Sequence, residues 1–442
     1  MTRTLILSFA VAALADGCST PRAVETATPR QFSPPAVEPS GGAVPADAPR
    51  PAQAEPPGPL TLRRAFELAD RFHPEVAVAM AQLEAARGRS QQAGLLPNPS
   101  VVGRMESAPI EGRTTGDAEY VAGITQRLPI GGRLSTASRA GRLEEERFER
   151  ELAARRFQVH RRVQGAFAAA LYLDEAIKVE TRAVRIAESG LGATNARLAA
   201  GDALEEDVAR AEIDLERARL ELERAQSLRE QAQAELRAAI GSPSLASAPL
   251  EGALDAALEL PALESLSARL VNHPLMAAAE ASVAVQNARL DLAEAQRIPD
   301  VNLDLFYRRL EISHTDAFDV GIAIPIPLFD RNRGGIREAQ AALAAATAQV
   351  RSTRNELERD LRQAHARLAS ALADSRVLHE VILPRAEIVL RASEARHAAG
   401  DASLGDVLPV RREHTAIRLA HLESLRQVME AWTALSAFLP RE

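Results

Sequence analysis

Four short motifs occur twice in this chain, and the duplication constrains the fold more than any other feature. The partners lie in the same order and are 198 to 202 residues apart. The pairs are His73-Pro74 with His273-Pro274, Leu96-Pro97-Asn98 with Ile298-Pro299-Asp300, Leu128-Pro129-Ile130 with Ile326-Pro327-Leu328, and Ala200-Gly201-Asp202 with Ala399-Gly400-Asp401. A fixed long period is the mark of a repeated supersecondary unit. We therefore predict two tandem repeats, at 60–250 and 260–442.

Each repeat is predicted to begin with a helix, for example 262–296, and to continue with two strands. Apolar residues alternate with other residues over 301–306 and over 320–326, which is the period-2 pattern of a half-buried strand. The first repeat has weaker strands at about 100–106 and 120–128. The chain thus supplies about four strands.

Very long helices are predicted after the strands, at 132–199 and 335–399, followed by a Gly-Asp turn and a returning helix. At about 1.5 Å per residue, each unbroken helix would be roughly 100 Å long. Glycine suits the left-handed conformation that ends a helix, and aspartate can cap the next helix. Each repeat therefore ends in a long helical hairpin with its turn at the tip.

Both hairpins have a coiled-coil period, which in the second covers the ascending residues Ile336, Ala339, Leu343, Ala346, Val350, Thr353 and Leu357. The seam of the first is Leu204, Val208, Ala211, Leu215, Ala218, Leu222, Ala225, Arg229, Ala232, Leu236 and Ala239. Only Arg229 interrupts its apolar character. Spacings of four and three residues favour left-handed supercoiling against a neighbouring helix.

The N-terminus resembles a bacterial lipoprotein signal. A basic residue and a short apolar run precede Gly17-Cys18, which predicts a signal peptide at 1–17 and a lipidated Cys18. Asp16 departs from the small residue usual at its position, and the alternative is an ordinary cleavage site with an incidental cysteine. Residues 18–59 are rich in Pro and Ala and predict a disordered tether.

Composition excludes several classes of function. The formal net charge of −7, from 53 basic and 60 acidic residues, argues against nucleic-acid binding. A single cysteine excludes intrachain disulfides and Cys-rich zinc sites. We find no catalytic constellation and predict no enzyme activity and no cofactor. His414 and His421 are too far apart along a helix to share a metal, and His73 and His273 are predicted to begin helices.

Four strands cannot close a barrel, and an open sheet in lipid would leave the backbone groups of its edges unpaired. Three copies would supply about twelve strands, enough for an outer-membrane barrel. The predicted fold is therefore mostly α with a membrane β-barrel portion. A trimeric 12-stranded barrel in outer-membrane lipid would be continued by a periplasmic α-helical coiled-coil barrel.

This design resembles the TolC family of outer-membrane efflux proteins, over about 60–438 of the chain. The resemblance implies a homotrimer in the bacterial outer membrane that projects into the periplasm. It also implies a passive exit channel of a tripartite system, with a periplasmic adaptor and an inner-membrane transporter of the RND type as partners.

The segment 324–334 resembles the strand-to-helix signature of the heavy-metal branch, the CzcC and CusC type. Its signature residues are Pro325, Pro327, Phe329, Asp330, Arg331 and Asn332. The prolines lack the amide donors of a strand ladder and suit a strand end, and Asp330 or Asn332 can cap the following helix. This resemblance implies export of heavy-metal cations.

The turns resemble the tips with which the family meets its adaptor, which implies docking roles for Gly201, Asp202, Gly400 and Asp401. Asp207 and Asp406 resemble carboxylates that constrict the family's pore, although Pro409 stands where a second aspartate is often found. In a trimer, three Asp406 side chains would form a ring that attracts cations. Repulsion between the three like charges would raise the pKa of Asp406. The alternative is a solvated aspartate that complements a helix dipole.

Two rival functions remain open. One is a multidrug or protein-secretion duct of the same family. The other is a periplasmic adaptor, although an adaptor has one helical hairpin between small β domains and this sequence predicts two.

Overall fold

The computed structural model describes residues 58–106, 118–242, 248–254, 258–310, 312–313, 315–436 and 438–439. All belong to one compact unit, Pro56–Glu442. The predicted signal peptide, Cys18 and nearly all of the predicted tether lie outside the described residues. Within the described ranges, no helix combines the length and the apolar character needed to cross a membrane.

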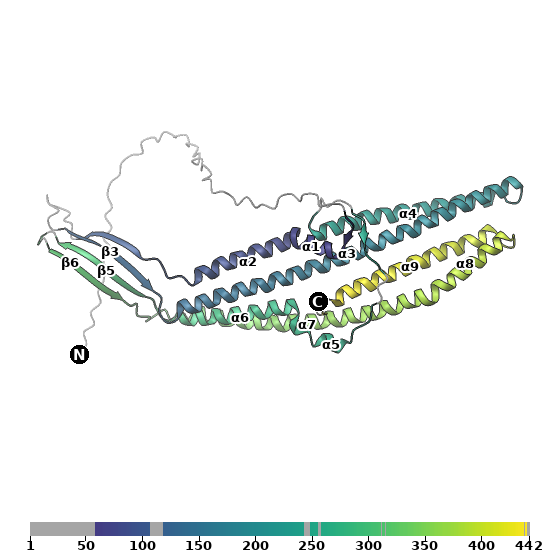
Figure 1. Cartoon of the computed structure of the whole chain (residues 1–442). Helices are drawn as coiled ribbons and strands as arrows, with labels where there is room; N and C mark the ends of the chain where they lie inside the picture. The colour runs from purple at the N-terminus through teal and green to yellow at the C-terminus, as the bar shows by residue number, and fades with distance from the viewer. Residues whose placement is uncertain are drawn as a thin grey trace, which may run out of the picture. The chain divides into compact units, whose positions relative to one another are not determined.

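The order of helix, two strands and long helical hairpin occurs twice (Figure 1). The first copy contains β1 (Leu60–Thr61), α1 (Leu62–Phe72), α2 (Pro74–Ala93), β2 (Ser100–Glu106), β3 (Glu119–Leu128), α3 (Arg133–Ala200) and α4 (Glu205–Ile240). The second contains β4 (Leu250–Glu251), α5 (Leu263–Ser267), the 3₁₀ turn η2 (Leu270–Asn272), α6 (Pro274–Ala295), β5 (Val301–Leu310), β6 (Thr315–Ala323), α7 (Arg333–Val377), the π turn η3 (Leu378–Ile382), α8 (Leu383–Ala398) and α9 (Leu404–Ser436).

The prediction of one helix over 262–296 is wrong, because the chain leaves the helical conformation at His273. A residue before proline is disfavoured in the helical region, and His273 has φ −68° and ψ 136°. Its Nδ1 accepts the backbone N–H of Leu275 at 3.2 Å, and His73 caps α2 in the same way through Glu75 at 3.1 Å. The predicted helix-start role of both histidines is confirmed.

A four-stranded antiparallel sheet joins the two copies in the order β2-β3-β5-β6. Its central pair runs from Glu119 opposite Leu310 to Leu128 opposite Val301. The last strand ends at Ala323 and does not reach the predicted 326, because Pro325 has no N–H for a ladder. A short parallel pair joins β1 of the first copy to β4, the first element of the second.

The helices pack around two apolar cores, one for each copy. The first holds Val76, Val159 and Ile240, and the second holds Met276, Leu361, Leu368 and Leu435, among others. Helix α3 packs against α4, α2, α6 and α9 and so connects the copies. Arg229, which interrupts the seam of α4, forms an ion pair with Asp174 of α3.

The prediction of one continuous helix at 335–399 is wrong. The π turn η3 separates α7 from α8, and the Leu383 N–H reaches the Leu378 carbonyl five residues back. Pro384 follows directly and has no N–H for an ordinary helical bond. The first hairpin has no such break, because α3 is a single α-helix from Arg133 to Ala200.

Candidate functional site

One face of the four-stranded sheet is polar and is tied together across its strands. At its centre, the Arg308 guanidinium donates to Glu119 at 2.6 Å and to Asp319 at 2.9 Å. The Thr125 hydroxyl donates to Asp304 at 2.6 Å on the same face. These contacts join β3, β5 and β6, so the polar side chains hold one another across the sheet.

The opposite face of the sheet is apolar and exposed in the single chain. Since successive side chains of a strand point to opposite faces, the residues next to the polar set form this second surface. Val101 of β2 is 84% exposed, and Phe318 and Val320 of β6 are 75% and 78% exposed. Met105, Tyr120, Ile124, Leu303, Leu305, Tyr307 and Ile322 are also exposed. An apolar surface of this extent marks a contact with another protein or with lipid.

The two outer strands of this sheet, β2 and β6, each pair with one neighbour among the described strands. Each therefore presents a row of backbone donors and acceptors that can pair with another strand. The sheet has two open edges, one apolar face and one polar face.

A buried aspartate fixes the sheet to the helices. Asp300, just before β5, accepts hydrogen bonds from Arg127 of β3 at 2.6 Å and from Arg133 of α3 at 3.0 Å. Gly131 lies at the same junction with φ +68°, and a Cβ built there would be 2.6 Å from Ile298. The strand-to-helix turn of the first copy therefore has no room for a side chain.

The two hairpin turns have the same geometry. Gly201 and Gly400 have φ of 83° and 85°, a left-handed conformation that glycine adopts at little cost. The backbone N–H of Asp202 donates to the Arg197 carbonyl at 2.8 Å, and that of Asp401 donates to the Arg396 carbonyl at the same distance. Neither aspartate accepts a helix-capping hydrogen bond, so the predicted capping role of Asp202 and Asp401 is wrong.

The structure brings the two tips together around one hollow of about 330 Å³. Thr194, Arg197, Ala203 and Asp207 line it from the first hairpin, and residues 400–404 and Asp406 line it from the second. Beside it, Leu404 and Leu408 of α9 pack on Ala211 of α4. The space around a Cβ at either tip glycine is open.

Asp207 and Asp406 both lie in the first turn of a helix. Asp207 accepts the backbone N–H of Leu204 at 3.1 Å. Asp406 accepts both the hydroxyl of Ser403 at 2.7 Å and its N–H at 3.0 Å. These bonds from Ser403 lower the pKa of Asp406 in the single chain. Asp406 therefore binds Ser403 at the start of α9.

The segment after β6 exposes its apolar side chains. Phe329 is 99% exposed, and Ile326 and Leu328 are also exposed. Asn332 begins α7 with φ 52°, and its side chain donates to the Ala293 carbonyl at 2.8 Å. Asp330 accepts the N–H of Asn332 at 2.9 Å, while Arg331 donates to the Pro327 carbonyl at 3.2 Å. Asp330 and Asn332, the two predicted caps, make no side-chain capping bond to α7 among the described residues.

The model of the outer membrane efflux protein family matches residues 67–242 and 266–440, which is most of the chain and one match per copy. The chain belongs to this family. The TolC-type resemblance of the sequence is thereby confirmed.

Two curated relatives of this efflux family member are metal-resistance proteins from Cupriavidus metallidurans. The cobalt-zinc-cadmium resistance protein CzcC is 30% identical over 88% of this chain and 91% of its own length. The nickel and cobalt resistance protein CnrC is 34% identical over 72% of this chain and 74% of its own. These relatives place the chain in the heavy-metal branch of the efflux family.

Solved structures share the fold of this efflux protein. A structure of CusC, from work on folding and transmembrane channel formation, has a TM-score of 0.71 at 19% identity, over 89% of this chain and 98% of that one. VceC of Vibrio cholerae has a TM-score of 0.69 at 20% identity, over 85% and 95%.

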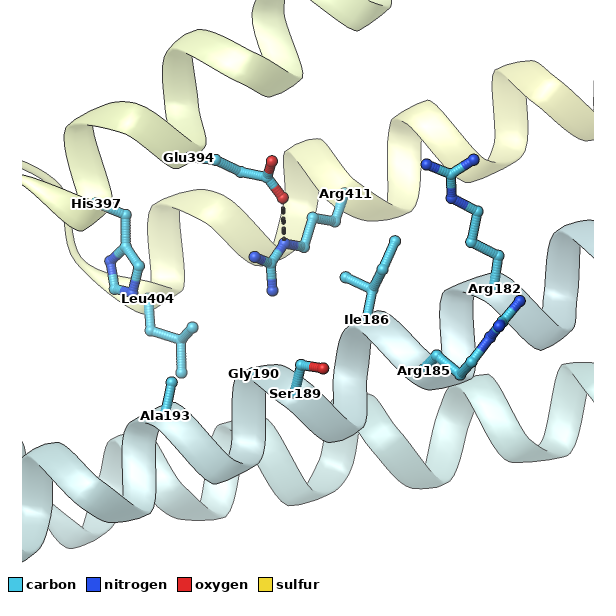
Figure 2. Close-up of a pocket in the computed structure, with 10 residues that line it drawn as sticks. All are labelled: Arg182, Arg185, Ile186, Ser189, Gly190, Ala193, Glu394, His397, Leu404 and Arg411. Atoms are coloured by element: carbon cyan, nitrogen blue, oxygen red, sulfur yellow. Dashed lines mark hydrogen bonds and ion pairs between the residues drawn. The ribbon is translucent and has the colours of Figure 1, made fainter.

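The efflux protein also has a basic groove above its tips that the sequence did not reveal (Figure 2). This groove, of about 680 Å³, lies between α3 and the hairpin of α8 and α9. Arg182, Arg185 and Arg411 line it, and Glu394 accepts from Arg411 at 3.0 Å. Arg182 and Arg185 are three residues apart on α3, whereas Arg411 lies on α9, so only the packing of the hairpins brings Arg411 to the other two.

Proposed function

We propose that this chain is one third of an outer-membrane exit channel in a tripartite efflux system. The observation that carries the proposal is the sheet with one apolar face, one polar face and two open edges. In lipid, open edges are costly, and barrels remove them by closure. Three chains would pair β6 of each with β2 of the next and close a barrel of twelve strands, with the polar face around Arg308 inside.

The proposed substrate is heavy-metal cations. The support is the chain's similarity to CzcC and CnrC, proteins named for resistance to cobalt, zinc, cadmium and nickel. The multidrug alternative rests on the shared fold alone. Conduction would be passive, with energy supplied by an inner-membrane transporter of the RND type, and no catalytic step is proposed.

The hairpin tips are the proposed docking site for a periplasmic adaptor. Gly201 and Gly400 have open space around them, and Asp202 and Asp401 follow in matching turns. A partner helix could therefore approach both tips without meeting a side chain at the glycines.

Asp207 and Asp406 are proposed to narrow the periplasmic entrance as carboxylates around a three-fold axis. Both line the hollow between the tips, which supports a shared location. In a trimer, like charges around the axis would raise the pKa of Asp406 against the lowering that Ser403 produces. A carboxylate ring of this kind favours entry of cations over anions.

The sequence supports a further proposal for the N-terminal part. Residues 1–17 would be removed as a signal peptide, and a lipid on Cys18 would add an anchor in the outer membrane. Residues 18–59 would tether the folded repeats to this anchor. Cys18→Ala should then abolish acyl labelling and slow processing of the precursor. Unchanged labelling would remove the lipid anchor and leave the channel proposal intact.

The channel proposal is tested by placing a lysine on either face of β6. Val320→Lys would expose a charge to lipid, at a cost of roughly 2–4 kcal/mol near the bilayer centre, and should abolish outer-membrane trimers and metal resistance. Ala323→Lys lies on the opposite face of the same strand and is the matched control. Equal assembly and resistance in both variants would contradict a lipid-facing role for the apolar surface.

The docking proposal has its own test. Gly400→Trp should leave trimer yield unchanged while abolishing both adaptor crosslinking and metal resistance, because bulk at the open tip blocks a partner helix. If Gly201→Trp and Gly400→Trp both keep wild-type crosslinking at normal trimer levels, the adaptor docks elsewhere.

A further inference from the structure

Two links between the sheet and the helices meet at a seam within the chain. The link from α6 into β5 lies beside the link from β3 into α3, since β3 pairs with β5 and α3 packs against α6. Ile298 of the first link lies so close to Gly131 of the second that a Cβ on Gly131 would be 2.6 Å from it. This seam is therefore packed by an apolar side chain against bare backbone.

The duplication places the same two kinds of link at the open flanks of the chain. The link from α2 into β2 contains Leu96-Pro97-Asn98, the counterpart of Ile298-Pro299-Asp300. The link from β6 into α7 contains Ile326-Pro327-Leu328, the counterpart of Leu128-Pro129-Ile130. Since β2 and β6 are the outer strands of the described sheet, the outer side of each link is open. Leu95 and Leu96 are accordingly exposed.

The link after β6 presents an aromatic ring from a backbone that is held in shape. Two glycines separate the strand-end motif of the first copy from α3, whereas four residues, beginning with Phe329, separate that of the second from α7. Phe329 is 99% exposed. The Leu328 N–H donates to the Ile326 carbonyl at 2.9 Å, and the Asn332 side chain ties the link to the Ala293 carbonyl of α6. A fixed and exposed aromatic ring is typical of a residue that anchors a contact.

The strand directions decide which segments can meet at the open flanks. Neighbouring strands are antiparallel throughout the sheet, so β2 leads away from the helices and β6 leads back to them. When β6 of one chain pairs with β2 of the next, the link after β6 lies at the level of the link before β2. A ring of three chains repeats this contact three times and closes. The seam between chains thus has the same arrangement of links as the seam within a chain.

We propose that Phe329 of each chain packs on Leu95 and Leu96 of the next chain and fastens the three subunits at the foot of the barrel. The inference rests on the proposed trimeric barrel and adds residues that join its subunits outside the strands. Leu96 has the position that Ile298 has in the seam within the chain, and Phe329 begins the segment that replaces the two glycines. Lipid fits this link less well than protein, because Asp330 and Arg331 follow the ring directly and charges are costly in hydrocarbon.

The test is disulfide crosslinking of the full-length protein in outer membranes, with Phe329→Cys and Leu96→Cys combined in one chain. Mild oxidation should link two and then three chains, because each chain offers one thiol to either neighbour. Neither single variant should crosslink, and since both keep Cys18, a link to that residue would be seen there. Phe318→Cys with Leu96→Cys is the matched control, because Phe318 is also an exposed aromatic residue of this flank but lies within β6.

A second measurement is the temperature at which the detergent-extracted trimer separates into single chains. Phe329→Ala should lower this temperature, because the ring contributes contact area between subunits, whereas Phe318→Ala should leave it unchanged. Trimers of normal mass that do not crosslink through the Phe329→Cys and Leu96→Cys pair would overturn the proposal, leave the channel intact and indicate that lipid covers the ring. Wild-type protein recovered only as single chains would overturn both the proposal and the channel.

Discussion

The two helical hairpins have matching ends but differ in the middle. The tips are nearly identical, with glycine φ angles of 83° and 85° and the same 2.8 Å bond from the residue that follows. Between sheet and tip, α3 is one unbroken α-helix, whereas the second hairpin passes through a π turn before Pro384. The two copies therefore share the geometry of their tips, while only the second contains a π turn among the described residues.

The same stretch also differs in chemistry. Where the second hairpin has two histidines, α3 of the first has Glu180, which is buried and packs beside α4. The first hairpin thus has a continuous ascending helix with the buried carboxyl group of Glu180. The second has a π turn, where His379 stacks on His421.

The largest effect is expected from removing one residue from either ascending helix. Deletion of Glu380, combined with Pro384→Ala, shortens the π turn by one residue and should give a continuous α-helix with normal trimer yield. Deletion of Thr181 from α3 should abolish trimers, because about 100° of rotation would misplace every side chain between it and the tip. Trimer yield in outer-membrane fractions measures both, and equal loss would contradict the expectation that the π turn can be shortened without rotating the rest of the hairpin.

A second contrast concerns glycines at the two ends of α3. Gly131→Ala should strongly reduce thermal stability, because the new Cβ would lie 2.6 Å from Ile298 as well as at a positive φ. Gly201→Ala meets open space and should lose only the conformational cost, about 1–2 kcal/mol. Thermal unfolding of the purified protein compares the variants. A similar loss in both would mean that the junction is not as tightly packed as described.

Glu180 gives the first hairpin a pH dependence. Burial, and then the charge of Glu221, raises the pKa of Glu180 in the folded chain above its unfolded value. Between the unfolded and the folded pKa of Glu180, the folded state binds more protons than the unfolded state. The stability of the folded state therefore falls as pH rises through this range. Glu180→Gln should therefore stabilise the protein at neutral pH and have no such effect in acid.

Unfolding midpoints measured from acid to neutral pH test this prediction, with the exposed Glu223→Gln on α4 as the control. A gain from Glu180→Gln that does not change with pH would show that the carboxyl group is not desolvated.

The smallest effect is expected at the helix starts beside the tips. Asp406→Ala removes the acceptor of two bonds from Ser403, whereas Asp207→Ala removes the acceptor of one bond from Leu204. Asp406→Ala should therefore lower the melting temperature more. Because its pKa is depressed in the folded chain, the contribution of Asp406 should disappear as pH falls through that lowered value. The reverse order of the two variants would remove the capping explanation.

Much of the fold could be predicted because it rests on local patterns. The strand that begins at Val301, the returning helix α4 of the first hairpin and the Gly-Asp tips follow from alternation, heptads and turn residues. The errors occur where one residue overrides a pattern. His273-Pro274 breaks an apolar helical stretch, Pro325 ends a strand early, and Pro384 accompanies a π turn within a heptad repeat.

The candidate site was less predictable because it depends on contacts between distant segments. Arg182 and Arg411 meet only when the two hairpins pack, and His379 meets His421 only through the π turn. Motif resemblance located the tips and Asp406, but it could not show that Ser403 already holds the Asp406 carboxylate.

The most direct test of the central proposal is the mass of the protein extracted from outer membranes in mild detergent, measured with its conductance in a planar bilayer. A chain that supplies a third of a barrel should be recovered as a complex of three chains that conducts ions. Recovery as a water-soluble single chain, with no outer-membrane fraction and no conductance, would contradict it.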